Sequence, residues 1–275
     1  MRFKRKDATA ELRSLMGDYE LPTFSGVAVS TLTLLREEGD MAKIADRLMA
    51  DPGLTVRMLR TVNSAAFGMR QGVTNLQHAV SLLGRSRVEA LVLTAAVGNA
   101  LPTMNGLDGR AFWHTSALRA CLAKGIAGRV DPSHSVECFT AGLLQDMAIP
   151  VLEQVHPDRY PSVFAEAESD PSVTLRELER DAFGYDHTQV GAIMAETWEL
   201  PNELVTAIAA HHDEGGEAPR PVQAVACVRH GSIDPELDGL KSHCRDVLEI
   251  PDGALGRIIE SADEECTSLA ESIAA

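Results

Sequence analysis

The chain has 275 residues, enough to bury one large core or two smaller ones. Apolar residues make up 45% of it but aromatic residues only 4%, so aliphatic side chains and alanine must fill the interior. Such a composition favours packed helices over a β-sandwich. The formal net charge of −15 argues against nucleic-acid binding, because contacts to phosphates need a basic face.

The ends of the chain and its cysteines indicate a cytoplasmic protein. A basic run opens the sequence with Arg2, Lys4, Arg5 and Lys6. We interpret this run as a solvated tail, because the polar residues that follow it exclude a secretory signal peptide. The apolar stretch around residues 90–98 is too short to cross a bilayer, so we expect no membrane contact. Five cysteines without a C-x-x-C pair are typical of reduced thiols.

Apolar residues at three- and four-residue spacing predict a bundle of short helices from residue 21 to about 101. Asp40 is placed to cap a helix over residues 41–49, and Asp51 with Pro52 opens the next one. Thr74 and Ser86 are expected to cap the two helices after that. The predicted core of this bundle includes Leu54, Met58, Leu59, Val62 and Leu83.

A second set of helices is predicted after residues 98–109, which lack periodicity and indicate a boundary. Capping-box spacing starts one helix at Thr174 and another at Asp186. Pro201 opens a further helix. The predicted inner faces comprise His114, Leu118, Cys121 and Leu122; Phe139, Leu143, Leu144 and Met147; and Leu204, Val205, Ile208 and His212.

The last predicted helix carries an apolar seam with alternating spacings of four and three. Its members are Leu255, Ile259, Ala262, Cys266, Leu269 and Ile273. The seam covers fewer than three heptads, so we favour packing back onto the body of the protein. A homodimer through this C-terminal helix is the alternative.

These patterns together predict an all-α protein, because no strand alternation, dinucleotide fingerprint or P-loop is present. We expect an N-terminal helical bundle packed on a second helical lobe. The predicted parts are an N-terminal tail or helix at 1–20, the bundle at 21–105, the second lobe at 106–230 and a C-terminal helical extension at 231–275.

Seven histidines lie between Arg110 and His230. A lone inward histidine is usually a hydrogen-bonded core residue. Several histidines that converge with Asp146 would instead form a site for a first-row metal. Residue spacing alone leaves both alternatives open.

Several runs of the sequence resemble the HDOD domain family. The most characteristic run is DPGLTVRMLRTVNSAAFG at 51–68, after Leu21-Pro22 and before TNLQHAVSLLG at 74–84. Further matching runs are FWHTS at 112–116, AGLLQD at 141–146, DHTQVG at 186–191 and the segment from Trp198 to His212. The resemblance extends from about Leu21 to Arg229, and it implies an HD-like fold for the second lobe and a role in bacterial regulation.

HDOD domains are relatives of the HD and HD-GYP metal phosphohydrolases, and the resemblance allows their metal ligands to be placed on this chain. His114 matches the first histidine and Asp146 the aspartate of the His-Asp pair. The histidine of that pair is Gln145 here, and the late aspartate is Cys227. The later histidines match His187, His211 and His212, and no GYP signature follows them.

These replacements predict a vestigial metal cluster and a protein that is not an enzyme. A phosphohydrolase needs bridging carboxylates to hold two metals, and the residues left here could hold one at most. We expect no catalytic residues, no cofactor and no bound metal, with Asp146 satisfied by a neighbouring imidazole. A single zinc is the alternative state of the cluster.

The predicted function is regulatory binding, through contacts with other signalling proteins or with a small ligand. The alternative function is a metal-dependent phosphohydrolase that acts on a nucleotide or a cyclic dinucleotide.

Overall fold

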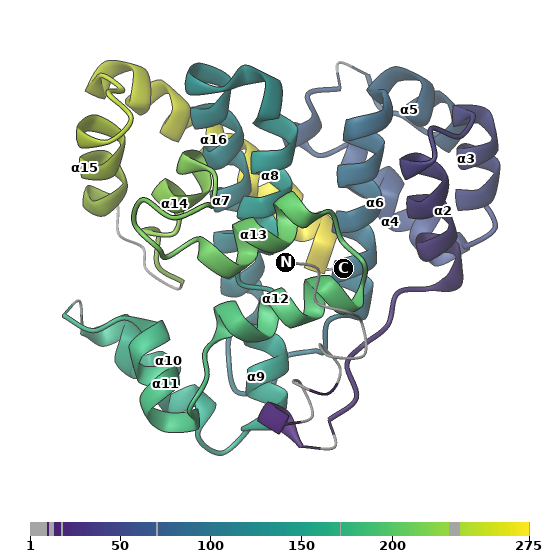
Figure 1. Cartoon of the computed structure of the whole chain (residues 1–275). Coiled ribbons are helices and arrows are strands. Elements are labelled where there is room, and N and C mark those ends of the chain that lie inside the picture. The colour runs from purple at the N-terminus through teal and green to yellow at the C-terminus, as the bar shows by residue number, and fades with distance from the viewer. Residues whose placement is uncertain are drawn as a thin grey trace.

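A computed structural model describes residues 10, 14–17, 19–69, 71–170, 172–230 and 237–274. Every regular element in these ranges is a helix and none is a strand, which confirms the predicted all-α fold (Figure 1). None of the helices in these ranges has both the length and the apolar character needed to cross a bilayer.

The N-terminal bundle lies at the right of Figure 1. It consists of α2 (Gly26–Arg36), α3 (Met41–Leu48), α4 (Pro52–Val62), the 3-10 helix η1 (Ala65–Phe67), α5 (Leu76–Leu83) and α6 (Arg85–Ala100). Four of the five predicted core residues are buried, with Met58 and Val62 completely covered. Leu59 is the exception: it is only half-buried at the edge of the core.

Two of the predicted helix caps in this bundle are confirmed. The side chain of Asp40 accepts a hydrogen bond from the backbone N–H of Ala42 at 3.0 Å at the start of α3. The side chain of Asp51 accepts a hydrogen bond from the backbone N–H of Leu54 at 3.0 Å, with Pro52 as the first residue of α4. A carboxylate at this position satisfies a backbone donor that has no partner within the helix.

The other two predicted caps are wrong. Asn75, and not Thr74, caps α5 by accepting from the N–H of Gln77 at 2.8 Å. The next helix starts directly at Arg85 and takes Ser86 into its first turn. This early start depends on Gly84, whose φ of 75° reverses the chain within one residue, a conformation that glycine adopts without strain.

The second lobe is built around two long buried helices, α7 (Gly109–Val130) and α8 (Ser135–Leu144), which pack against each other. Around them lie the 3-10 helix η2 (Pro132–His134), α9 (Ile149–Val155), α10 (Tyr160–Ser169), α11 (Leu175–Phe183), α12 (His187–Thr197), α13 (Asn202–Ala210) and α14 (Arg220–Val225). The connection between the bundle and this lobe is shorter than predicted, because α6 continues through Gly98 to Ala100.

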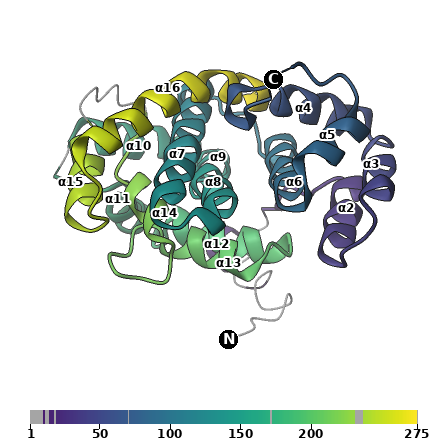
Figure 2. The ribbon, with the colours of Figure 1, turned by 90° about the horizontal axis from the view of Figure 1, so that it is seen from above.

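The C-terminal segment, α15 (Asp238–Asp246) and α16 (Asp252–Ala274), joins the two parts. Figure 2 shows α16 running along one side of the molecule, over α7 and on to the bundle, where it contacts η1 and α4. The seam residues Leu255, Ala262, Cys266, Leu269 and Ile273 are all at most 2% exposed, so the helix packs back on the body as predicted. A homodimer through α16 would have to use its other face.

We expect Met58→Ala to destabilise the protein by about 2–5 kcal/mol, because it leaves a cavity in a fully covered part of the bundle core. Leu59→Ala is the matched variant on the same helix, and it should cost clearly less because this side chain is only partly buried. Urea unfolding followed by circular dichroism measures both values. Equal losses for the two variants would contradict the observed helix orientation.

Candidate functional site

Asp146 lies at the base of a cavity of about 330 Å³ in the second lobe. It belongs to the tight turn between α8 and α9 and is only 3% exposed. Side chains from α7, α12 and the end of α13 also line the cavity, including Arg119, His187, His211 and His212. The structure therefore brings together residues that are up to 93 positions apart in the sequence, counting from 119 to 212.

The first histidine of this site, His187, is positioned by a helix cap. The fully buried side chain of Asp186 accepts from the N–H groups of Thr188 and Gln189 at 2.9 and 3.0 Å, which confirms the capping box predicted here. Arg180 on α11 forms an ion pair with the same carboxylate, with its Nε 2.5 Å from Oδ2. Asp186 is thus held both by backbone N–H groups of α12 and by Arg180 of α11. This fixes the start of the helix, so that its first residue, His187, enters the cavity.

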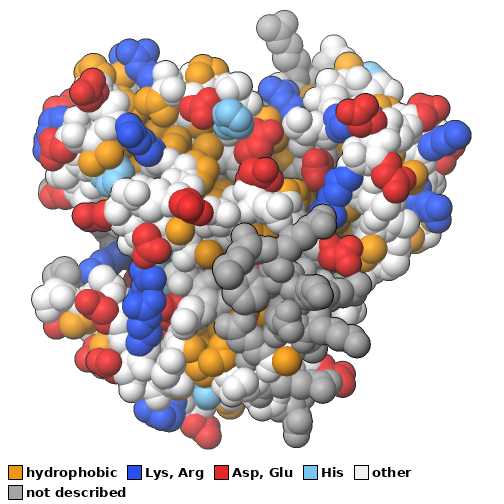
Figure 3. All heavy atoms as spheres, in the orientation of Figure 1, with side chains coloured by type: hydrophobic (Ala, Val, Ile, Leu, Met, Phe, Trp, Pro, Cys, Tyr) orange, Lys and Arg blue, Asp and Glu red, His pale blue; other side chains and the backbone are white. Residues whose placement is uncertain are grey.

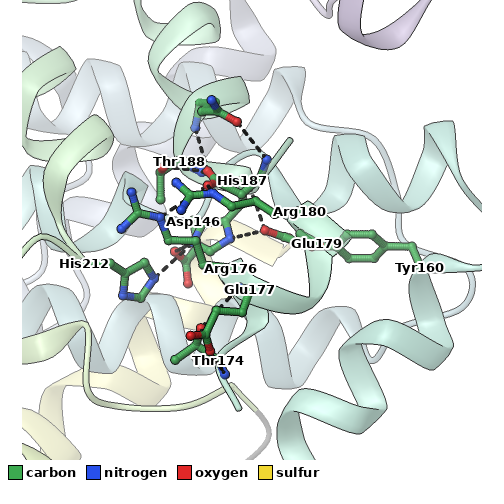
Figure 4. A network of polar contacts seen from close by, with 12 residues as sticks. Asp146, Tyr160, Thr174, Arg176, Glu177, Glu179, Arg180, His187, Thr188 and His212 are labelled. Carbon is green, nitrogen blue, oxygen red and sulfur yellow. Dashed lines mark hydrogen bonds and ion pairs between the residues drawn. The ribbon is translucent and has the colours of Figure 1, made fainter. Parts of the chain in front are cut away.

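A buried carboxylate on α11, Glu179, fixes the orientation of the His187 ring (Figure 4). Its Oε2 lies 2.6 Å from Nδ1 of His187 and accepts the backbone N–H of the same residue at 2.8 Å. The hydroxyl of Tyr160 donates to Oε1 at 2.5 Å. With Nδ1 engaged by Glu179, the other ring nitrogen, Nε2, points toward Asp146 and His212. The sequence analysis did not identify Glu179.

The two consecutive histidines after α13 have different roles. His211 is buried, and its Nδ1 donates to the carbonyl of Ile208 at 2.8 Å, so that its Nε2 lies 3.1 Å from Oδ1 of Asp146. His212 lies at the cavity wall, partly exposed, with its Nε2 3.1 Å from Nε2 of His187. The expected inward residue of the pair was His212, whereas His211 is the buried one.

Arg119 is the functional residue that the sequence analysis missed most clearly. From the middle of α7 its Nη1 forms a buried ion pair with Oδ2 of Asp146. Its Nε donates to the carbonyl of Val228 at 2.8 Å. A charged residue inside the apolar run ALRACLA was the available signal, since such a residue on a buried helix needs a partner.

His230 completes the surroundings of Oδ2. Its Nε2 lies 2.5 Å from this oxygen, and its ring stacks on Phe112 with centroids 5.2 Å apart. An imidazole thus contacts Oδ2 of Asp146, but it is one that the sequence analysis had not selected, and Oδ1 has no hydrogen-bond partner among the described residues. Arg119 and His230 together occupy Oδ2, so Oδ1 is the oxygen that faces His187 and His211.

The charges in this site shift the titration of its groups. Burial acts to raise the pKa of Asp146, but the charge of Arg119, the hydrogen bonds of His211 and His230 and the charge of His187 together outweigh it and hold that pKa well below its usual range. Burial acts to lower the pKa of His187, but the charge and hydrogen bond of Glu179 and the charges of Asp146 and Asp186 together outweigh it and raise that pKa to about 9. Burial, followed by the charge of Arg119, lowers the pKa of His230 to about 4. Burial and the neighbouring histidines also lower the pKa of His212.

His114 does not belong to this site, and its assignment as the first ligand is wrong. Its side chain is exposed, and its Nε2 lies 3.5 Å from Sγ of Cys266 on α16. His114 and Arg119 are five residues apart on α7, which places them about 140° apart around the helix. Because Arg119 faces the cavity, His114 cannot.

The two replaced ligand positions of the predicted cluster also stay outside the group of converging atoms. Gln145 is buried, and neither atom of its amide has a hydrogen-bond partner among the described residues. Cys227 lines the cavity and is exposed to solvent there. The side of its thiol that faces the protein is shielded from water, and this raises the pKa of the thiol. The ligand atoms that do converge belong to Asp146, His187, His211 and His212.

Comparison with known families identifies the family of this chain. The family model of the HDOD domain matches residues 21–214, which contain the bundle and the whole cluster of Asp146 and the three histidines. The chain belongs to the HDOD domain family. The resemblance noted in the sequence is therefore confirmed, and the matched region ends just beyond His212.

Solved structures from several bacteria share this fold at low sequence identity. A candidate phosphohydrolase from Shewanella amazonensis is 21% identical, with a TM-score of 0.73 and coverage of 97% of this chain and 98% of the other. An HDOD domain protein of unknown function from Geobacter sulfurreducens is 22% identical, with a TM-score of 0.67 and coverage of 98% and 97%. A candidate signal transduction protein from Marinobacter aquaeolei is 18% identical, with a TM-score of 0.73 and coverage of 98% and 66%.

A curated relative, an uncharacterized protein from Treponema pallidum, is 22% identical over 174 residues. The match covers 63% of this chain and 34% of that protein, so the chain spans about a third of the length of this relative. All these identities lie below 25%, and the likeness to the solved structures concerns the fold alone.

Arg119→Met should lower the free energy of unfolding by about 3–5 kcal/mol, because it leaves the Asp146 carboxylate buried without its cation. Arg110→Met is the matched control, since Arg110 is an exposed residue on the same helix, and it should change stability by less than about 0.5 kcal/mol. Urea unfolding at pH 7 measures both. Equal effects would show that the buried ion pair contributes no special stability.

His230 should make the protein less stable in mild acid. The pKa of about 4 in the folded state lies below the ordinary histidine value of 6.5, so the unfolded state takes up a proton first as the pH falls from 6.5 to 4. The resulting loss is about 2–3 kcal/mol over this range. His230→Gln retains an amide N–H for Asp146 and does not titrate, so its stability should depend less steeply on pH. Identical pH profiles from chemical unfolding would refute this assignment.

Proposed function

We propose that this HDOD protein works as a regulatory binding protein and does not hydrolyse phosphate esters. The observation that carries the proposal is the buried ion pair between Arg119 and Oδ2 of Asp146. Two-metal hydrolysis needs a carboxylate that bridges two cations about 3.5–4 Å apart, with one oxygen on each. Arg119 and His230 already occupy one oxygen of Asp146, so only Oδ1 is left for a metal.

The other two positions that differ from the catalytic relatives support the same proposal. Gln145 offers a neutral amide in place of an imidazole, and an amide oxygen is a weak ligand for first-row metals. Cys227 has no carboxylate and lies apart from the converging ligand atoms. A cluster with one free carboxylate oxygen cannot neutralise two metals and the phosphate that would bridge them.

The surface is consistent with protein partners rather than nucleic acid. Acidic and basic side chains are interspersed over the face shown in Figure 3, and the chain as a whole has a net charge of −15. A nucleic-acid-binding face would gather lysine and arginine side chains along the phosphate backbone. Other signalling proteins are the partners that we propose, and the names of the solved relatives include both a candidate signal transduction protein and candidate phosphohydrolases.

The purified chain should show no turnover of cyclic di-GMP or bis-p-nitrophenyl phosphate above the rate of the metal ions alone, with manganese, iron or zinc added. Product release followed by chromatography and by absorbance measures this rate. Asp146→Asn and the surface variant His114→Ala should be indistinguishable from the unchanged protein in both assays.

Turnover that disappears in Asp146→Asn but persists in His114→Ala would contradict the proposal. That result would assign the cavity to the alternative function, a metal-dependent phosphohydrolase. The pair of variants separates activity of this site from a contaminating hydrolase, because a contaminant would be equally active in all three preparations.

A further inference from the structure

A cleft of about 350 Å³ lies between the N-terminal bundle and the second lobe. Its walls are α6 of the bundle and α13 of the second lobe, and its floor is α8, which packs against both of them. Figure 2 shows α13 on the opposite side of the molecule from α16. Among the described residues, the cleft shares no lining residue with the cavity around Asp146, so it is a separate feature of the surface.

Aliphatic side chains from all three helices line the inside of the cleft. They are Ala90 and Leu93 of α6, Val136 and Ala141 of α8, and Leu204 and Ala207 of α13. Five of the six belong to the packed core and are therefore held in place, while Val136 is partly exposed. A preformed apolar surface of this kind is stabilised when another apolar group covers it.

Three carboxylates, one from each helix, surround this apolar lining. Glu89 belongs to α6, Glu137 to α8 and Glu203 to α13. Glu137 and Glu203 are exposed, whereas Glu89 is half-buried. In the part of the chain that the structure describes, none of the three forms an ion pair with a lysine, arginine or histidine. The cleft is thus an apolar surface with an acidic edge.

Glu89 has the least access to water of the three. Burial raises its pKa and the carboxylate of Glu137 adds to the rise, while Arg36 and Arg85 act against it. Arg85 is engaged elsewhere, because its guanidinium donates to two backbone carbonyls at and just beyond the end of α2. A cation from outside the chain would therefore meet carboxylates that no internal ion pair neutralises.

We infer that this cleft binds a segment of a partner protein in which lysine or arginine residues flank apolar side chains. The inference rests on the proposed function, since it takes the partner to be a protein, and it specifies the chemistry that the partner presents. An apolar centre with a polar edge is the usual anatomy of a protein interface. A groove between helices accepts an amphipathic helix, whose apolar side chains enter the groove while its charged side chains meet the edge.

The charges and polar groups of the cleft argue against other occupants. Nucleic acids and anionic membranes present phosphate groups, which the carboxylates repel. A second copy of this chain carries the same net charge of −15 and is disfavoured for the same reason. A small ligand is oriented by fixed polar groups. In the cleft, however, the hydroxyl of Thr140 already donates to the carbonyl of Val136 at 3.0 Å, and the ring of His134 pairs with Asp131 at 2.8 Å.

The first experiment measures the binding of a synthetic helical peptide to the full-length chain by fluorescence anisotropy at physiological ionic strength. The peptide has about 18 residues, or five helical turns, with leucines along one face and lysines beside them. Two twin peptides carry glutamine or glutamate in place of every lysine. We expect the lysine peptide to bind at least about tenfold more tightly than the glutamine twin, and the glutamate twin to bind most weakly.

Variants assign this binding to the cleft. Glu137→Lys combined with Glu203→Lys reverses two exposed carboxylates of the edge, so it should weaken binding of the lysine peptide at least about tenfold and strengthen binding of the glutamate twin. Glu260→Lys combined with Glu264→Lys is the matched control, since it changes the net charge equally at two exposed positions of α16. Circular dichroism checks that both double variants are folded.

A second experiment identifies the natural partner in cells of the source organism. A photoreactive amino acid replaces Ser86, an exposed residue that lines the cleft, and the same amino acid in place of Glu260 is the control position. The segment crosslinked at position 86 is sequenced by mass spectrometry. It should come from another protein, carry lysine or arginine next to aliphatic residues, and be lost when Glu137 and Glu203 are both reversed.

Equal binding of the three peptides would overturn the inference. A loss of binding that both double variants share would do the same, because the net charge of the chain and not the cleft would then attract the peptide. The inference is also overturned if no protein is crosslinked at position 86, or if the crosslinked segment is acidic or belongs to a second copy of this chain. The proposed function fails separately, through turnover that depends on Asp146, a residue outside the cleft.

Discussion

The buried ion pair between Arg119 and Asp146 is the interaction on which the arrangement of the second lobe depends. A carboxylate removed from water must be paired, and Arg119 provides the cation from the centre of α7. The same guanidinium donates to the carbonyl of Val228, so it also holds the segment that follows α14. Through this one side chain, α7, the turn after α8 and the segment at 228–230 keep a common register.

Because of the ion pair, the two oxygens of Asp146 have different neighbours. Oδ2 takes part in the internal structure through Arg119 and His230, while Oδ1 faces the rings of His187 and His211. Only Oδ1 is therefore turned toward the cluster of histidines, because Oδ2 is engaged by Arg119 and His230.

The rigidity of the site comes from the elements that carry it. His187 follows a doubly held cap, in which Asp186 accepts backbone N–H groups and pairs with arginines on α11. Glu179 is fully buried and adds the contact from Tyr160 on α10. The N-terminal bundle is connected to this lobe by α16, which lies along α7 and reaches α4.

The sequence by itself determined the helical class, most helix starts and the family, because these depend on local patterns. Asp40, Asp51, Thr174 and Asp186 were recognised as caps from the residues that directly follow them, and the structure agrees. The caps at Thr74 and Ser86 failed because Asn75 competes for the same role and Gly84 turns the chain early. Asp146, His187 and the pair of His211 and His212 were also recovered, since they lie in characteristic runs of the sequence.

Only the tertiary structure decided which side chains meet at Asp146. Arg119 and His230 lie 27 and 84 positions from Asp146 and belong to no short motif, and Glu179 reaches the site through His187, so these contacts depend on how α7, α11 and the segment after α14 pack. His114 was excluded for the same reason: the rotation of α7 that brings Arg119 to the carboxylate turns His114 toward α16. Sequence spacing shows which residues share a face of a helix. Which face points inward depends on the partner across the core, because a charged side chain can be buried only where an opposite charge meets it.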